Sequence, residues 1–205
     1  MNAKGRVVMD YNTRLEELII ANDGLLLTRT AEIAGIPRQY LTLFVKSGKL
    51  ERIAQGIYLS ADAYDDEMYC IQARSNRAVF SHETALFLHD LTDRDPIQFC
   101  VTIPAGYNGT NLRTAGVKVY SVKKELHLVG LSERKTQHGR TIKTYDLERT
   151  ICDIVRSRSQ IDIGILTEAL KRYSKRKDKS ISTLMDYGDL FGIKKMLRQY
   201  MVVLL

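Results

Sequence analysis

The stretch TRTAEIAGIPRQYLTLFVKSGKLERIAQGIYLS, residues 28–60, decides the fold of the N-terminal part of this chain. A short helix is expected over 29–34, and Gly35 ends it. A second helix is expected over 37–47, because a proline suits the first helical position, where its missing N–H needs no partner. Gly48 closes that helix. Two short helices joined by a tight turn are therefore predicted.

A hairpin is predicted directly after these helices. Residues 50–53 and 57–60 have the apolar pattern of short strands, and Gly56 lies in the turn between them, where a positive φ is expected. Upstream, residues 13–22 place their apolar side chains on one helical face. The order helix, helix, turn, helix, strand, strand is typical of a winged helix-turn-helix domain, which binds DNA by laying one helix in the major groove.

The helix over 37–47 has the two faces that such a role requires. Leu41, Phe44 and Val45 are spaced to face the other two helices. The residues expected to face DNA share the opposite, polar side: Arg38, Gln39, Thr42 and Lys46. Arginine can pair with guanine through two hydrogen bonds, and glutamine can pair with adenine in the same way. Tyr40 lies between the two faces and is expected to donate its hydroxyl to a phosphate.

Phosphate contacts are predicted on both sides of this helix. Lys49 and Arg52, on the hairpin, would supply positive charge beside the groove. Thr28 and Arg29 begin the preceding helix, and a helix N-terminus attracts phosphate. Residues 28–60 carry five basic and two acidic side chains, a net charge of +3. This segment is thus suited to a polyanion.

Length and composition indicate a folded protein. The chain has 205 residues, of which 44% are hydrophobic and 27% charged, with a net charge of +7. That length allows two domains, and a change of pattern after residue 62 predicts a boundary between 1–62 and 63–205. Two later segments are basic, 113–143 and 171–205, each with a net charge of +6. They would be either solvated faces or further nucleic-acid contacts.

The region after residue 62 mixes expected helices and strands, so the fold class is α+β, a winged helix-turn-helix followed by a mixed α+β domain. Residues 104–111 are expected to form a loop, and 171–180 a basic link between helices. The expected strands are 97–103, 116–122, 125–131 and 140–146. The expected helices are 64–74, 82–90, 146–158, 163–173 and 193–205.

No site for a metal, a cofactor or catalysis is predicted. The three cysteines form no CxxC pair and are typical of reduced, buried thiols. His82 and His89 are seven residues apart, whereas a metalloprotease helix needs a spacing of four. Glu148 and Asp153 lie on different faces of one helix, which is interpreted as solvated. There is no phosphate-binding loop and no run long enough to span a membrane, so a cytoplasmic protein is expected.

Three blocks of this chain resemble the abortive-infection antitoxins of the AbiE type (AbiEi-like), the bacterial transcriptional regulators of type IV toxin–antitoxin systems. They are residues 28–60, quoted above, then SHETALFLHDLTDRDP at 81–96 and YDLERTICDIVR at 145–156. Residues 104–140 and 171–205 carry no motif of this kind. The resemblance therefore spans most of the chain.

The resemblance implies a bacterial, cytoplasmic antitoxin that acts in phage defence and is not an enzyme. Its N-terminal domain would bind double-stranded promoter DNA at inverted repeats and repress its own operon. Its second domain would counter a nucleotidyltransferase-like toxin without forming a stable complex with it. Two alternatives stay open from the residues alone. One is a nucleic-acid-acting enzyme with a winged-helix targeting domain, and the other is a protein-interaction module.

Overall fold

The computed structural model describes residues 10–64 and 66–204, and it divides the chain into two compact units. The N-terminal unit ends at Arg74 and the second unit begins at Ser75. The boundary falls twelve residues later than the sequence suggested (74 against 62), because helix α4 (Glu67–Arg74) packs against strand β3 of the N-terminal unit. Helices and strands occur in both units, which confirms the α+β class.

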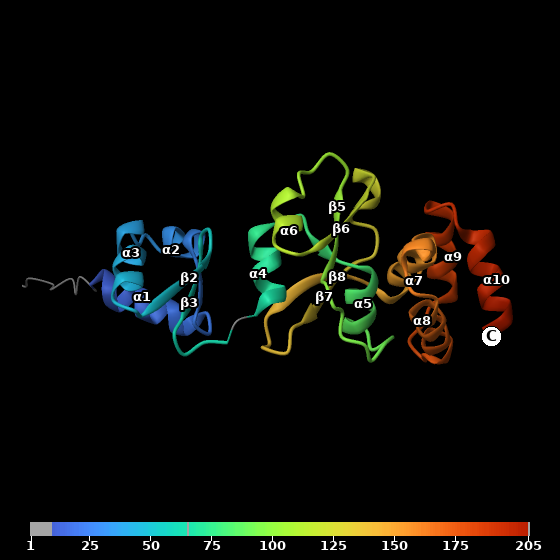
Figure 1. Ribbon diagram of the computed structural model, residues 1–205, viewed down its shortest axis with the longest axis horizontal. Helices are drawn as coiled ribbons and strands as arrows, with labels where there is room; N and C mark the ends of the chain where they lie inside the picture. The colour runs from blue at the N-terminus through green and yellow to red at the C-terminus, as the bar shows by residue number, and fades with distance from the viewer. Residues whose placement is uncertain (1–9, 65, 205) are drawn as a thin grey trace, which may run out of the picture. The chain divides into compact units, whose positions relative to one another are not determined.

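The N-terminal unit has three helices and a three-stranded sheet ahead of α4 (Figure 1). The sheet order is β1-β3-β2, with antiparallel pairing throughout. Strand β1 was not predicted, because three consecutive leucines give no alternating pattern. Its pairing with β3 buries Leu25 and Leu26. The elements are α1 (Tyr11–Ala21), β1 (Leu25–Leu27), α2 (Thr28–Ile33), α3 (Arg38–Lys46), β2 (Leu50–Ala54) and β3 (Ile57–Ser60).

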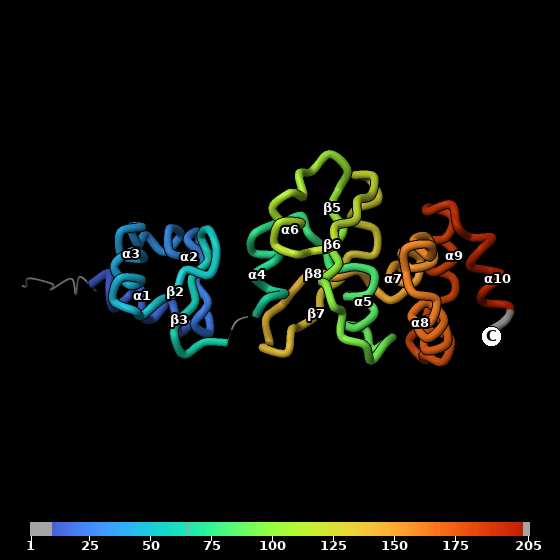
Figure 2. Tube along the Cα trace, in the orientation of Figure 1, coloured from blue at the N-terminus to red at the C-terminus, as the bar shows by residue number. Residues whose placement is uncertain are grey.

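The second unit is built on a five-stranded mixed sheet of order β6-β5-β4-β8-β7. Pairing is parallel for β5–β6 and β4–β8, and antiparallel for β4–β5 and β7–β8. Figure 2 follows the chain through these strands. The short strand β4 and helix α6 were not predicted. The elements are β4 (Val79–Phe80), α5 (His82–Leu88), β5 (Cys100–Pro104), α6 (Thr110–Thr114), β6 (Lys118–Val122), β7 (Leu131–Lys135) and β8 (Thr141–Tyr145).

Two strand predictions are corrected by the structure. The strand expected over 97–103 is β5, which begins at Cys100, lies between β6 and β4 and is buried along its whole length. Ile97, inside the expected strand, is fully exposed. The expected strand 125–131 is instead a 3₁₀ turn, η1 (Lys124–Leu126), followed by turns. Its carbonyl oxygens at residues 126, 127 and 129 accept hydrogen bonds from side chains rather than from a neighbouring strand.

Four helices and a 3₁₀ turn form the C-terminal part of the second unit, α7 (Leu147–Arg156), η2 (Arg158–Gln160), α8 (Ile163–Lys175), α9 (Ile181–Leu190) and α10 (Lys194–Leu204). Their apolar residues share one core with those of α5. Helix α9 was not predicted, since Gly188 weakens its helical pattern. A side chain there would come within 2.8 Å of Leu197, so the glycine lets α9 and α10 approach closely. The predicted basic link is half helix, because α8 continues to Lys175.

Candidate nucleic-acid interface

Helix α3 separates its apolar and polar residues as the sequence predicted. Leu41 and Phe44 are buried in the core formed with α1, α2 and β2. The four residues expected to face DNA are all exposed: Arg38, Gln39, Thr42 and Lys46. Pro37 precedes the helix as its N-cap residue, with φ −64° and ψ 140°, instead of forming its first turn. The polar edge of α3 thus starts with Arg38, at the tight turn that follows α2.

Arg38 has a partner that the sequence analysis did not identify. Its guanidinium forms an ion pair with Glu32, at the end of α2, and this contact raises the pKa of Arg38 above its ordinary value. Both side chains are well exposed, and exposed pairs of this kind contribute little to stability. The Glu32 carboxylate therefore orients the guanidinium at the edge of α3. Because the pair contributes little to stability, Arg38 can exchange Glu32 for another acceptor at little cost.

The remaining residues of α3 extend this edge. Tyr40 is half-buried, and its ring lies 5.0 Å from the ring of Tyr11 in α1. Leu43 is 53% exposed beside the polar residues, although it is apolar. Lys46 and Gln39 form no ion pair or side-chain hydrogen bond in the described part of the chain. Their polar groups are available to a ligand.

The hairpin of β2 and β3 is fixed to the helices at two points. The Lys49 ammonium lies 2.5 Å from the Glu16 carboxylate of α1 and 5.1 Å from the centre of the Phe44 ring. At the turn, the backbone N–H of Thr28 donates to the carbonyl of Gly56 over 2.9 Å. Arg52 is exposed, and its Nε donates weakly to the Ala54 carbonyl over 3.4 Å. The hairpin is therefore held beside α2 and α3.

The hydrogen bond to Gly56 limits the phosphate contacts that Thr28 can make. Thr28 is the first residue of α2, but its backbone N–H is already used by the hairpin, so it does not offer that group to phosphate as expected. Only its side-chain hydroxyl remains for such a contact. Arg29 is exposed and forms no ion pair among the described residues. All nine predicted residues thus lie on α2, on α3 or on the β2 strand with the turn before it.

The second unit contains charged residues that the sequence analysis placed wrongly. Helix α7 was interpreted as solvated, yet every residue from Leu147 to Val155 is buried, including Glu148 and Asp153. The cause is the packing of α7 against α5, α8, α9 and α10. The Arg149/Asp153 spacing of four and the Asp153/Arg156 spacing of three were the signals that pointed to internal ion pairs.

Arg149 is fully buried at the centre of this arrangement. Its Nε donates to Asp153 over 3.1 Å, and one terminal nitrogen donates to the carbonyls of Leu126 and Val129 at 2.9 and 2.7 Å. Its guanidinium lies 4.0 Å from the centre of the Tyr145 ring and 4.2 Å from that of Phe191. Burial raises the pKa of Asp153, while the guanidinium groups of Arg149 and Arg156 oppose that rise. The arginine thus joins the irregular segment before β7 to the helical core.

His82 is also buried and also fully engaged. Its Nδ1 lies 2.9 Å from the Ser81 hydroxyl and its Nε2 lies 3.0 Å from the Ser157 hydroxyl. Its ring stacks on Tyr120 with 3.5 Å between the ring centres. Burial lowers the pKa of His82 well below its ordinary value, and Arg156 adds to that effect. Among the described residues, no group of three His, Cys, Asp or Glu side chains has the arrangement of a metal site.

Part of the charge of the later basic segments is used within the second unit. Lys118 is paired with Glu83 at 3.2 Å, and Arg134 contacts the His89 ring at 3.0 Å. Arg172 is paired with Asp93 and Glu168, and Arg176 with Asp178. No helix in residues 10–64 and 66–204 has the length and apolar character needed to cross a bilayer.

Comparison with solved structures gives a relative in fold. The crystal structure of the RV2827C protein from Mycobacterium tuberculosis matches with a TM-score of 0.62 and covers 94% of this chain and 80% of that chain. The two sequences are only 13% identical, so the likeness concerns the fold alone. Among curated proteins, none matches this chain.

Comparison with protein families gives a relative in sequence. The model described as "Transcriptional regulator, AbiEi antitoxin" matches residues 14–61, which extend from α1 to the end of the hairpin. This match covers the polar edge of α3, the paired Arg38 and the strand that carries Arg52. Residues 14–61 of this chain are therefore similar to the family of AbiEi antitoxin transcriptional regulators.

Proposed function

We propose that this protein is a type IV antitoxin that binds inverted repeats in its own promoter and represses its operon. Arg38, Gln39, Thr42 and Lys46 would face the major groove from α3. Tyr40, Lys49, Arg52, Arg29 and the Thr28 hydroxyl would contact the phosphates on either side. The second unit would counter a nucleotidyltransferase-like toxin without a stable complex, in the bacterial cytoplasm.

The observation that carries this proposal is the exposed polar edge of α3 above a fully apolar underside. Arg38 is directed by a surface pair with Glu32, and Lys46 and Gln39 have no side-chain partner among the described residues. A solvated surface helix also exposes polar residues, but it does not require hydrogen-bonding side chains of these particular types. A helix that enters the major groove needs them, because base edges are read by hydrogen-bonding side chains.

The burial of the carboxylates in α7 and the exposed edge of α3 bear on the two alternatives. A nucleic-acid-acting enzyme in the second unit would need accessible catalytic carboxylates, but Glu148 and Asp153 are buried and engaged with Tyr173, Ser180 and arginines. A winged helix used for protein contact would leave DNA affinity unchanged when α3 is altered. Binding to DNA therefore separates the proposals.

The test is a binding titration of the full chain with labelled DNA from upstream of its own gene. Fluorescence anisotropy would compare that DNA with a shuffled duplex of the same length and composition, at several salt concentrations. We expect preferential binding to the upstream DNA, with an affinity that falls steeply as salt rises, since each neutralised phosphate releases counterions. Equal affinity for both duplexes would contradict the proposal.

A further inference from the structure

A groove between α8 and α10 is a feature of the second unit that the proposed function does not use. It has a volume of about 670 Å³ and nine lining residues. Its floor is apolar: Leu166 and Leu170 are buried below it, and Met196 and Tyr200 are partly buried. Ile163 lies at its edge and is 72% exposed. An apolar floor open to water favours burial by another molecule.

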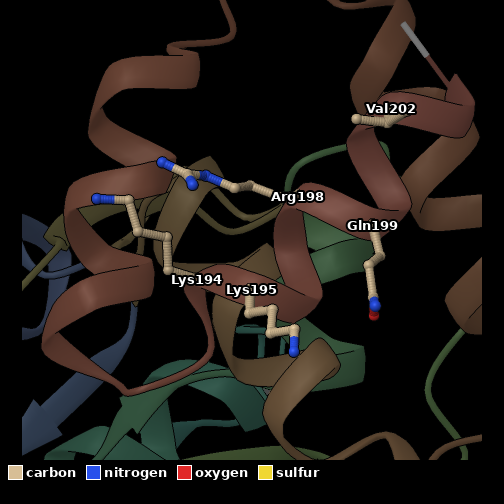
Figure 3. Close-up of a pocket in the computed structure, with 5 residues that line it drawn as sticks. All are labelled: Lys194, Lys195, Arg198, Gln199 and Val202. Carbon is tan, nitrogen blue, oxygen red and sulfur yellow. The ribbon is translucent and has the colours of Figure 1, made fainter.

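The groove continues onto the outer surface of α10. A second hollow, of about 730 Å³, is lined by α10 alone, and Gln199 lines both hollows. Figure 3 shows Lys194 and Arg198 projecting to one side of this helix, and Lys195 and Gln199 to another. Val202 lies one turn further along and is 83% exposed. The apolar surface is thus extended and bordered by cations.

The charges around this surface are nearly all positive. Arg158 and Lys171 line the groove, and Lys195 and Arg198 line the hollow. Within residues 10–64 and 66–204, none of these four forms an ion pair. The nearby carboxylates are already engaged: Asp189 with Lys194, Glu168 with Arg172, and Asp162 with Arg94. The surface therefore lacks compensating negative charge.

We propose that the α8–α10 groove binds an acidic amphipathic helix of a partner protein. Apolar side chains at helical spacings of three and four would cover Met196, Tyr200 and Ile163, as in other helix-in-groove complexes. Carboxylates on the flanks of that helix would meet Arg158 and Lys171, which line the groove and supply charge complementarity. This site is separate from α3 and does not depend on DNA binding.

Charge argues against the other occupants of such a groove. A second copy of this chain on a two-fold axis would bring two such positively charged surfaces together, and like charges oppose such a contact. Nucleic acid would find the cations but would leave the apolar floor without a use, since Ile163 and Val202 offer no hydrogen bond. An acidic amphipathic segment satisfies both features.

The test uses the full chain and three synthetic 16-residue peptides with capped ends. The first has leucines at helical spacings of three and four and glutamates elsewhere; in the second, lysines replace the glutamates; in the third, serines replace the leucines. Fluorescence anisotropy of labelled peptides measures affinity, and ¹⁵N chemical shifts locate the site. We expect saturable binding of the first peptide only, with shifts confined to α8 and α10.

Surface variants make the test specific. R158E with K171E is expected to weaken binding of the acidic peptide at least tenfold. K123E with K177E, which makes the same change of charge at two exposed residues outside the groove, is expected to leave it unchanged. I163S with V202S would weaken binding without loss of fold, because both side chains are already in water.

Four results would overturn the inference. These are no binding of the acidic peptide, equal binding of the lysine peptide, a concentration-dependent dimer in sedimentation that V202S abolishes, or binding to phosphatidylglycerol vesicles that R158E with K171E abolishes. The third result would assign the surface to a second copy, and the fourth to a membrane. Normal binding of promoter DNA in every case would leave the proposed function standing.

Discussion

Helices α3 and α7 have similar lengths, but they use their charged residues in opposite ways. In α3, RQYLTLFVK, the cations remain at the surface. In α7, LERTICDIVR, Glu148, Arg149 and Asp153 are buried, because four other helices surround it. Burying a charge is costly unless it is paired, and each of these three has a partner. The comparison separates charges that hold a fold together from charges that are free to bind.

The largest effect is expected from breaking the buried pair in α7. Arg149→Met leaves the Asp153 carboxylate buried with only Arg156 beside it and removes two hydrogen bonds to carbonyls. The loss of one partner from a buried pair costs about 3–5 kcal/mol. Denaturant unfolding, followed by hydrogen exchange of the α7 amides, would measure it.

A matched control comes from α3. Lys46→Met makes the same change of charge at an exposed site and is expected to change stability by less than about 0.5 kcal/mol. The double variant R149M/D153L should recover part of the loss, because it no longer leaves a charge unpaired. Equal destabilisation by R149M and K46M would remove the distinction between the two helices.

The next largest effect is expected on DNA affinity, where changes in α3 rather than in α7 should matter. Arg38→Ala and Gln39→Ala are each expected to reduce affinity for the upstream DNA by about 1–3 kcal/mol and to weaken the preference over shuffled DNA. Their unfolding free energies should stay near that of the wild type, since both side chains are exposed. Arg74→Ala, at an exposed arginine of the same unit, is the control in anisotropy titrations.

Acid should affect the second unit through its buried histidines. Burial lowers the pKa of His82, His89 and His127 in the folded state, so the unfolded chain takes up protons at a higher pH than the folded chain does. Stability therefore falls as the pH drops below about 6.5, the ordinary histidine value. His82, whose pKa burial lowers well below its ordinary value, contributes to this loss.

Comparison with a His82→Asn variant isolates this contribution. Asparagine tolerates the positive φ of 51° found at this position. Burial also raises the pKa of Asp146 and Asp153, which acts in the opposite direction, but both chains share that effect. The wild type should lose more stability than the variant over this pH range in urea unfolding. Equal losses of stability in the wild type and the variant would show that His82 takes up a proton as readily in the folded chain as in the unfolded chain.

The smallest effect is expected from the phosphate contacts of the wing. Lys49→Ala and Arg52→Ala should each lower the slope of log affinity against log salt by about 1, with little change in sequence preference. Loss of the Glu16 ion pair accompanies the first change, so Glu16→Gln is its control. A change in preference for one sequence over another would show that these residues contact bases instead.

The sequence was sufficient where the fold depends on local patterns. The proline and glycines around α3, together with Leu41 and Phe44, predicted the helix, its buried face and its exposed polar edge. The same reasoning did not identify Glu32 and Glu16 as the partners of Arg38 and Lys49, because those contacts join residues six and thirty-three positions apart. Non-local contacts of this kind depend on how the helices pack.

The second unit was less predictable for the same physical reason. The sequence pattern identified α7 correctly, and Asp146 caps the helix by accepting a hydrogen bond from the Arg149 N–H at 2.8 Å. Its burial on all sides depends on α9 and α10, which follow later in the chain. The strand expected over 125–131 failed because its carbonyls are bound by Arg149 and Tyr145, distant residues that no local pattern reveals.

The central claim, that α3 lies in the major groove of promoter DNA, is tested most directly by methylation interference at guanine N7, which faces that groove. The account predicts that methylation of particular guanines in each inverted repeat blocks binding of the wild type. In the Arg38→Ala variant, one of those guanines should no longer matter, while the others stay sensitive. Binding that is indifferent to guanine methylation, or the same pattern in both proteins, would contradict it.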